Sequence, residues 1–220
     1  MSIEETPWDA AVFGMPTFEI RDYAEGDLIQ ASRSPGHYTI RVDPLASKAL
    51  LHAYGFYYCD TLIEPCCPKD KFRFHERPEF TASEGADLPE LLGICSGAFS
   101  HGRFHRDFNL DPNRADQRYD RWLASLHGQG KVLGLYREQS LIGFVAHSDG
   151  KLLLHAIAAK ERGKGYAKYL WSAACRQIYD GGISEISSSI SASNLAVVNL
   201  YASLGFRFGK ACDLYHCLVK

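Results

Sequence analysis

Arg162-Gly163-Lys164-Gly165-Tyr166-Ala167 stands between a strand-like run and a segment with helical periodicity. Consecutive unhindered amides at the start of a helix form a site for phosphate, and the helix dipole strengthens it. Glycine lets the backbone approach phosphate oxygens closely. The stretch therefore predicts a phosphate-binding loop that leads into a helix over residues 163–179.

Two better-known phosphate loops do not fit these residues. A nucleotide-hydrolysing P-loop needs Ser or Thr after its Gly-Lys pair, whereas Gly165 follows Lys164 here. A dinucleotide-binding fingerprint needs a third glycine three residues after the second, where this chain has Lys168. A plain flexible turn before the helix stays open as the alternative.

Outward from the loop, hydrophobic periodicity predicts alternating strands and helices. Upstream, we expect a strand over 71–80, helices over 87–99 and 115–126 joined by a loop over 103–113, and an antiparallel meander over 131–137, 141–147 and 152–158. Downstream, we expect a strand over 185–190, a helix over 194–204 and strands from residue 206 to the end. This order predicts an α+β fold, with a mixed, mostly antiparallel sheet flanked by helices.

The first third of the chain resembles the last. Leu50 to Pro65 aligns with Leu200 to His216 when Gly55-Phe56 is placed on Gly205-Phe206, and the same 150-residue offset aligns two strand-like runs, 37–42 and 185–191. Both regions read as strand, short helix, Gly-Phe turn and strand. We interpret this as a degenerate internal repeat; a chance recurrence of a common helix C-cap is the alternative.

Composition narrows the class of protein. The chain has 220 residues, 46% of them hydrophobic, and a formal net charge of -2, so it has material for a core and no basic field for nucleic acid or an anionic membrane. The acidic start has no signal-peptide pattern and no apolar run is long enough to span a bilayer, so we expect a cytoplasmic protein. Seven cysteines without a CxxC pair favour reduced thiols and no metal site.

Two groups of residues together resemble the GCN5-related N-acetyltransferase (GNAT) superfamily. Arg162, Gly165 and Ala167 match its loop motif, and a second motif follows downstream, comprising Asn194, Tyr201, Gly205 and Phe206. The resemblance covers residues 79–220 and implies a GNAT fold and an acetyl-CoA-dependent N-acetyltransferase. It divides the chain into a partial, degenerate GNAT-like domain over 1–75 and a catalytic domain over 76–220.

The resemblance also implies a cofactor site and two catalytic groups. Acetyl-CoA would be held by Ile157, Ala158, Arg162, Gly163, Lys164, Gly165, Tyr166, Ala167, Asn194 and Asn199. Tyr201 matches the family tyrosine that protonates the departing thiolate; the alternative is a core tyrosine, because it lies on one apolar helical stripe. His155, on the strand beside the loop, is the candidate general base for the acceptor amine, and a structural histidine is the alternative.

For the acceptor, the chain resembles superfamily members that N-acetylate dTDP-fucosamine (dTDP-4-amino-4,6-dideoxygalactose) for surface polysaccharide. The shared residues begin with Trp8 and Asp9, and the implied substrate-binding residues are Phe99, Arg103, Phe104 and Tyr119. The expected partner is a nucleotide-linked amino sugar, and a homodimer is compatible with the sequence. An acetyltransferase acting on a protein N-terminus, a lysine or a small amine is one alternative; a non-catalytic CoA-binding or subunit-contact module is another.

Overall fold

One mixed sheet runs through the chain in the computed structural model, which describes residues 2–21 and 23–220. Its strands follow the order β1-β2-β3-β11-β4-β9-β8-β7-β6-β5, and β10 pairs with β4 beside this path. The strands are β1 (Ile3–Glu5), β2 (Thr17–Ile20), β3 (Gly36–Val42), β4 (Tyr57–Pro68), β5 (Phe80–Ser83), β6 (Val132–Arg137), β7 (Ser140–Ser148), β8 (Lys151–Ile157), β9 (Glu185–Ser188), β10 (Ile190–Ser191) and β11 (Arg207–Val219).

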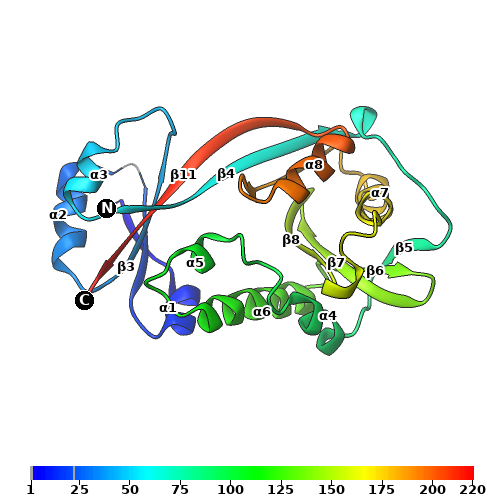
Figure 1. The fold of residues 1–220 in the computed structure, drawn as a ribbon, viewed down its shortest axis with the longest axis horizontal. Helices are drawn as coiled ribbons and strands as arrows, with labels where there is room; N and C mark the ends of the chain where they lie inside the picture. The colour runs from blue at the N-terminus through cyan, green and yellow to red at the C-terminus, as the bar shows by residue number, and fades with distance from the viewer. Residues whose placement is uncertain (1, 22) are drawn as a thin grey trace.

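Helices cover the sheet in both halves of the molecule (Figure 1). They are α1 (Pro7–Phe13), α2 (Glu25–Arg33), α3 (Ala49–Ala53), α4 (Leu88–Cys95), α5 (Arg103–Arg106), α6 (Pro112–Gly128), α7 (Ala167–Asp180) and α8 (Leu195–Ser203), with 3-10 turns η1 (Lys69–Lys71) and η2 (Ala159–Glu161). The α+β prediction and the antiparallel meander β6-β7-β8 are confirmed. None of the helices in the described residues is both long and apolar enough to span a membrane.

Three predicted elements are wrong in their bounds. The strand over 71–80 is absent from the described chain except at Phe80, where β5 begins. The helix expected from residue 163 starts at Ala167, because Gly163 and Gly165 take positive φ values of 75° and 77° that no helix allows. The last segment is one strand, β11, with a bulge after Phe208 in place of a strand break.

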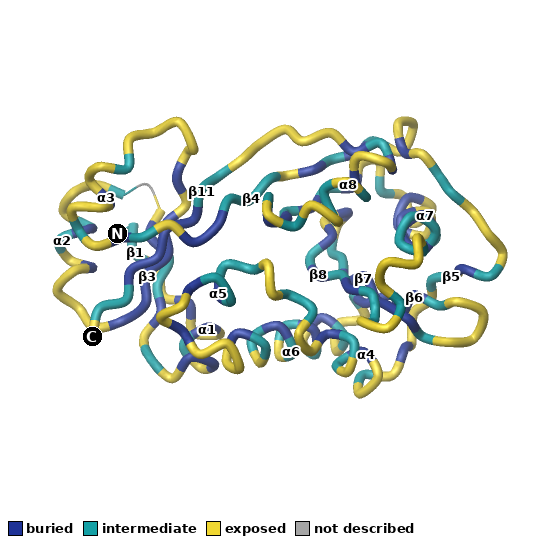
Figure 2. The backbone as a smooth tube through the Cα atoms, in the orientation of Figure 1, coloured by how far each residue is buried: buried dark blue, intermediate teal, exposed yellow. Residues whose placement is uncertain are grey.

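The long strands β4 and β11 lie side by side and join the two halves (Figure 1). Each strand also pairs with the opposite half: β11 with β3, and β4 with β9 and β10. The final strand of each half is therefore built into the sheet of the other. Much of the N-terminal part of β11 is exposed where it bridges the halves (Figure 2).

The residue-by-residue pairing of β4 with β11 is symmetric under the 150-residue offset of the sequence repeat. Leu62 lies opposite Cys212, Tyr57 opposite His216 and Arg207 opposite Cys66. A shift of 150 residues exchanges the partners of every such pair, and it carries the bulge in β11 onto the bulge in β4. A local two-fold axis thus passes through the Leu62–Cys212 pair.

The structure extends the repeat beyond the elements visible in the sequence. In the first half β2 runs parallel to β3 with α2 between them, and in the second half β8 runs parallel to β9 with α7 between them. An antiparallel strand precedes each unit, β1 beside β2 and β7 beside β8. Six elements therefore recur in the same order, from β1 to β4 and from β7 to β11, with α1 inserted in the first half and β10 in the second. Chance does not explain this agreement.

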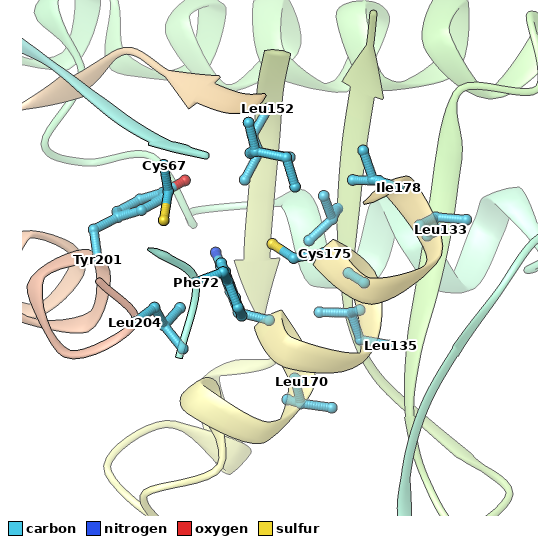
Figure 3. Close-up of a cluster of buried hydrophobic side chains, with 14 of the residues drawn as sticks. Cys67, Phe72, Leu133, Leu135, Leu152, Leu170, Cys175, Ile178, Tyr201 and Leu204 are labelled. Carbon is cyan, nitrogen blue, oxygen red and sulfur yellow. The ribbon is translucent and has the colours of Figure 1, made fainter. Parts of the chain in front are cut away.

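Separate apolar clusters fill the two halves. Ile40, Leu28 and Leu51 anchor the N-terminal cluster and are fully buried. The C-terminal cluster packs α7 and α8 on the sheet; Figure 3 shows Tyr201 beside Cys67 at one side of it. All seven cysteines carry free thiols, and five of them are buried.

Candidate active site

The glycine loop presents its backbone to solvent at the start of α7. Among the described residues, no backbone or side-chain acceptor takes the N–H groups of residues 163–167. A Cβ atom built on Gly163 or Gly165 would meet nothing within 4 Å, so the approach to these amides is open. The loop therefore offers consecutive free donors at the positive end of a 14-residue helix.

Strands β8 and β9 separate next to this loop. They pair only at Lys151 with Ser187 and Leu152 with Ser188, and the hydroxyl of Ser188 donates to the carbonyl of Leu152 at 3.0 Å. Beyond this point β10 turns away to pair with β4, so β8 has a free edge toward residue 157. An extended chain with amide groups could bond to this edge.

His155 and Tyr201 meet beside the open edge. The Tyr201 hydroxyl and Nε2 of His155 form a hydrogen bond at 3.0 Å. Burial lowers the pKa of His155 to about 4, so the imidazole is neutral at physiological pH and can accept this bond. Burial raises the pKa of the Tyr201 phenol, which keeps it protonated. The sequence singled out both residues, but it did not predict that they touch.

Trp171 is a third aromatic residue that contacts this pair. The indole of Trp171, on α7, stands edge-on to the His155 ring with 5.1 Å between centroids. Its Nε1 atom is buried and has no hydrogen-bond partner in the described chain. Trp171 is 2% exposed and belongs to the apolar cluster around α7. A polar donor thus lies free beside the catalytic candidates.

All four predicted acceptor residues line one cavity of about 390 Å³. They are Phe99, Arg103, Phe104 and Tyr119. His155 and Asn194 line the same cavity, so it reaches from the predicted acceptor residues to the His155–Tyr201 pair. Phe99 and Tyr119 stack within it at 4.5 Å between ring centroids.

The remaining predicted cofactor residues have mixed surroundings. Arg162 donates from Nε to the Ile157 carbonyl at 2.8 Å, which joins the loop to the end of β8. Lys164 forms an ion pair with Glu161 at 2.9 Å. The Tyr166 ring packs on Phe80, with 5.1 Å between centroids.

Two predicted asparagines and one alanine lie at the edges of this region. Asn194 accepts the Val197 amide and so caps α8, which is a structural role. Asn199 is exposed on the same helix and lines neither of the cavities described here. Ala158 follows β8, and its amide bonds to the Ile142 carbonyl.

Side chains of the polar loop around α5 form ion pairs and hydrogen bonds with neighbouring elements. His105 pairs with Asp116 at 3.0 Å, and Arg106 pairs with Asp60 of β4 at 2.5 Å. Asp107 is buried against His37 at 3.0 Å and His216 at 2.8 Å. These contacts join the loop that carries Arg103 to strands from both halves.

His37, Asp107 and His216 are spaced closely enough to hold a metal ion, with ligand atoms within 4.8 Å of one another. The carboxylate already accepts hydrogen bonds from both imidazoles, from the Tyr57 hydroxyl and from Asn109. Burial disfavours the charge of Asp107, but these donors outweigh it and lower its pKa. The carboxylate of Asp107 is thus satisfied as the centre of a hydrogen-bonded cluster, whereas Nε2 of His216 is buried without a partner in the described chain. The members of this cluster are too far apart in sequence for a motif search to group them.

Sequence reasoning missed two arginines of the cavity. Arg118, on α6, lines it directly before Tyr119 and one turn before Trp122. That helical spacing was a usable signal. Arg41 reaches the same cavity from β3 of the N-terminal half; no motif surrounds it, so nothing in the sequence pointed to it.

Comparisons with known proteins agree with this architecture. A family model described as "Acetyltransferase (GNAT) family" matches residues 98–206. No curated protein matches the sequence significantly.

Solved structures resemble the chain over most of its length. A GCN5-related N-acetyltransferase from Sphaerobacter thermophilus has a TM-score of 0.62 at 11% identity, covering 99% of this chain and 76% of its own. A tandem GNAT protein from the clavulanic acid biosynthesis pathway has a TM-score of 0.58 at 11% identity, covering 93% and 76%. A glucosamine N-acetyltransferase region of a fungal multi-domain β-N-acetylglucosaminidase has a TM-score of 0.57 at 11% identity, covering 82% and 25%. At these identities the likeness is one of fold.

Proposed function

This chain is an acetyl-CoA-dependent N-acetyltransferase of the GNAT family, and we propose that it acetylates the amine of a nucleotide-linked amino sugar, such as a dTDP-4-amino-4,6-dideoxyhexose. The observation that carries the proposal is one cavity that is lined both by His155 and by Arg103 and Arg118. It joins a proton-transfer pair to a cationic region suited to an anionic acceptor.

The glycine loop and the free edge of β8 fit the cofactor. The open amides of residues 163–167 would hold its pyrophosphate, and the edge of β8 beyond Leu152 would bond its amide-containing arm. Bound there, acetyl-CoA supplies the acetyl group as a thioester. Of the predicted cofactor residues, Asn199 has the weakest support, because it lies exposed on α8.

Proton transfer is the part we assign to His155 and Tyr201. The amine attacks the thioester carbonyl, the carbon–nitrogen bond forms and the carbon–sulfur bond breaks. The Tyr201 O–H protonates the departing sulfur, and the proton lost by the nitrogen returns to the tyrosine through Nε2 of His155. The 3.0 Å hydrogen bond between the two side chains supports this relay. No cysteine lines the cavity among the described residues, which favours direct transfer in a ternary complex.

The division of labour between the halves is also part of the proposal. We assign residues 1–75 to a degenerate copy without chemistry and residues 76–220 to the catalytic domain. Leu51 stands where Tyr201 stands in the second copy. Strands β2 and β3 stay paired over four positions, whereas β8 and β9 separate after two. The first copy is therefore closed where the second opens.

A thiol-release assay with acetyl-CoA and a panel of amines tests the acceptor class. The panel contains amino sugars with and without a linked nucleoside diphosphate, a polyamine and a peptide with a free N-terminus. We expect turnover with the nucleotide-linked amino sugars, at least tenfold higher in kcat/KM than with the free sugars. Turnover confined to the polyamine or the peptide would disprove the sugar assignment, and a thermal shift with acetyl-CoA but no turnover on any amine would indicate a binding module.

A further inference from the structure

The acceptor cavity continues into a second one. This second cavity has a volume of about 170 Å³ and is lined mainly by α1, β2 and β3 of the N-terminal half. The two cavities share four lining residues, Arg41, Arg103, Phe104 and Arg118. The shared wall is therefore cationic, and it is assembled from β3, α5 and α6.

The charges of this wall do not balance. Arg118 pairs with Asp9 at 2.7 Å and Arg41 with Glu19 at 2.9 Å, but Nη1 of Arg103 is buried without a partner in the described chain. Both the Arg103 and Arg118 guanidinium groups face the Phe104 ring, at 4.6 and 4.7 Å from its centroid. Three cations thus face two carboxylates.

Burial of the Arg103 guanidinium without a carboxylate partner costs folding free energy unless a bound anion pairs with it. Burial, with the neighbouring Arg118 and Arg41, lowers the pKa of Arg103 to about 10, which still leaves it charged at neutral pH. Planar guanidinium groups bind phosphate oxygens in pairs and are the usual residues for phosphate recognition. The wall is therefore matched to a phosphate group carrying more than one negative charge.

The second cavity also has an exposed aromatic side chain in its lining. Trp8, on α1, lines this cavity and is 62% exposed, which is unusual for so large an apolar side chain. Nucleobases stack on such rings. Thr39 lines the same cavity and adds a hydroxyl group that can bond to a sugar or a base.

We propose that the arginine wall of Arg41, Arg103 and Arg118 binds the diphosphate of the acceptor, and that the second cavity, with Trp8 at its rim, holds the nucleoside. This inference rests on the proposed function for the orientation of the acceptor, with its amine toward His155. The N-terminal copy then acts as the nucleoside-binding half of the enzyme, in place of the chemistry that it lacks.

Calorimetric titration of the full chain tests this assignment directly. The probes are inorganic pyrophosphate, dTDP and UDP, each titrated in the presence of saturating CoA so that the glycine loop is occupied. The variants are Arg103→Gln, Trp8→Ala and, as a matched control on the same helix as Arg118, Arg121→Ala, whose side chain bonds only to the Ala11 carbonyl. Circular dichroism checks that each variant is folded.

We expect pyrophosphate to bind the CoA-loaded protein and the better of the two nucleotides to bind at least tenfold more tightly. Arg103→Gln weakens both kinds of probe at least tenfold, Trp8→Ala weakens only the nucleotides, and Arg121→Ala changes neither. Binding that CoA abolishes, or that Arg103→Gln leaves unchanged, would overturn the site.

The failure of this site and the failure of the proposed function give different results. If the probes bind as expected but no amine is acetylated, the anion site stands and the acceptor assignment fails. If amines without phosphate are acetylated and neither nucleotide competes with them, the transfer chemistry stands and the nucleoside site fails.

Discussion

At the residue scale, the proposed proton transfer depends on the hydrogen bond between Tyr201 and His155. Tyr201 is fully buried, so its hydroxyl has no bulk water to exchange protons with. Removal of this hydroxyl leaves the ring in the core but removes the acid that we propose for the departing thiolate. Removal of this one oxygen atom therefore tests proton transfer separately from binding.

We expect Tyr201→Phe to lower kcat roughly hundredfold, within the range for a lost general acid, with little change in the KM for acetyl-CoA. Steady-state thiol release measures both constants. Tyr54→Phe is the matched control, because its hydroxyl bonds Glu25 at the surface of the other half. An unchanged kcat in Tyr201→Phe would remove the acid role.

The lowered pKa of His155 makes stability depend on pH. The folded protein keeps this histidine neutral down to about pH 4, whereas the unfolded chain takes up a proton near its ordinary pKa of 6.5. As pH falls through this window the unfolded state binds more protons, so the free energy of unfolding decreases by about 1.4 kcal/mol per pH unit. His216, with its pKa lowered to about 3 by burial, contributes in the same direction.

Urea unfolding at about pH 7.5 and about pH 5 checks this dependence. We expect the wild type to lose about 2 kcal/mol from His155 between these conditions, and His155→Gln to lose correspondingly less. The exposed His52 provides the control, since His52→Gln keeps the wild-type loss. Equal losses in His155→Gln and the wild type would show that His155 titrates normally in the folded state.

Sequence motifs singled out individual residues with strong chemical signatures, but they did not predict which side chains lie next to them. Tyr201 and Arg103 were identified from motifs. The partners that matter, Trp171 beside His155 and Arg41 beside Arg103, come from segments with no motif of their own. Such contacts depend on how the sheet is closed, which local periodicity does not encode.

At the scale of elements, the loop before α7 shows what its glycines contribute. Gly163 and Gly165 have positive φ values, and a side chain at either would meet open space. Their role is therefore conformational and not steric. An L-residue in this left-handed region costs about 1–2 kcal/mol, which the loop can relieve only by moving its amides.

We expect Gly165→Ala to weaken CoA binding roughly tenfold, as a backbone penalty of this size implies, with overall stability little changed. Calorimetric titration with CoA provides the measurement. Gly26→Ala is the control, because Gly26 lies in α2 without a positive φ and also has free space around it. If Gly165→Ala leaves the CoA affinity unchanged, the pyrophosphate does not bind at this loop.

Element types were largely predictable, and their ends and pairings were not. The meander and the presence of α4 follow from hydrophobic periodicity, although α4 ends at Cys95 and not at residue 99. The segment 71–80 alternates like a strand, yet most of it crosses from β4 to β5 without a pairing partner. Alternation of apolar and polar residues indicates that one face of the chain is buried and the other exposed. It does not indicate whether a neighbouring strand is present.

At the scale of the whole molecule, the exchange of β4 and β11 binds both halves into one folding unit. Ile40 on β3 is fully buried in the N-terminal cluster, but β3 is held at its side by β11 from the far end of the chain. Loss of packing in the first half should therefore reach the second half through the shared strands.

We expect Ile40→Ala to reduce the protection of β7 amides by the same free energy as it reduces that of β3 amides, about 3 kcal/mol. Native-state hydrogen exchange with mass spectrometry reports on both strands at once. Leu45→Ala, at a side chain that is 95% exposed, is the control. Protection lost in β3 but retained in β7 would mean that the halves unfold independently.

The two-fold axis through Leu62 and Cys212 has a consequence for oligomeric state. Two separate copies of a half-length chain could form the same strand exchange only as a closed symmetric dimer with two equal sites. Joined in one polypeptide, the copies are always present in equal number and at fixed distance, so dilution cannot separate them. One site is then free to diverge without loss of the other, and this asymmetry is something that a symmetric dimer of identical chains cannot acquire.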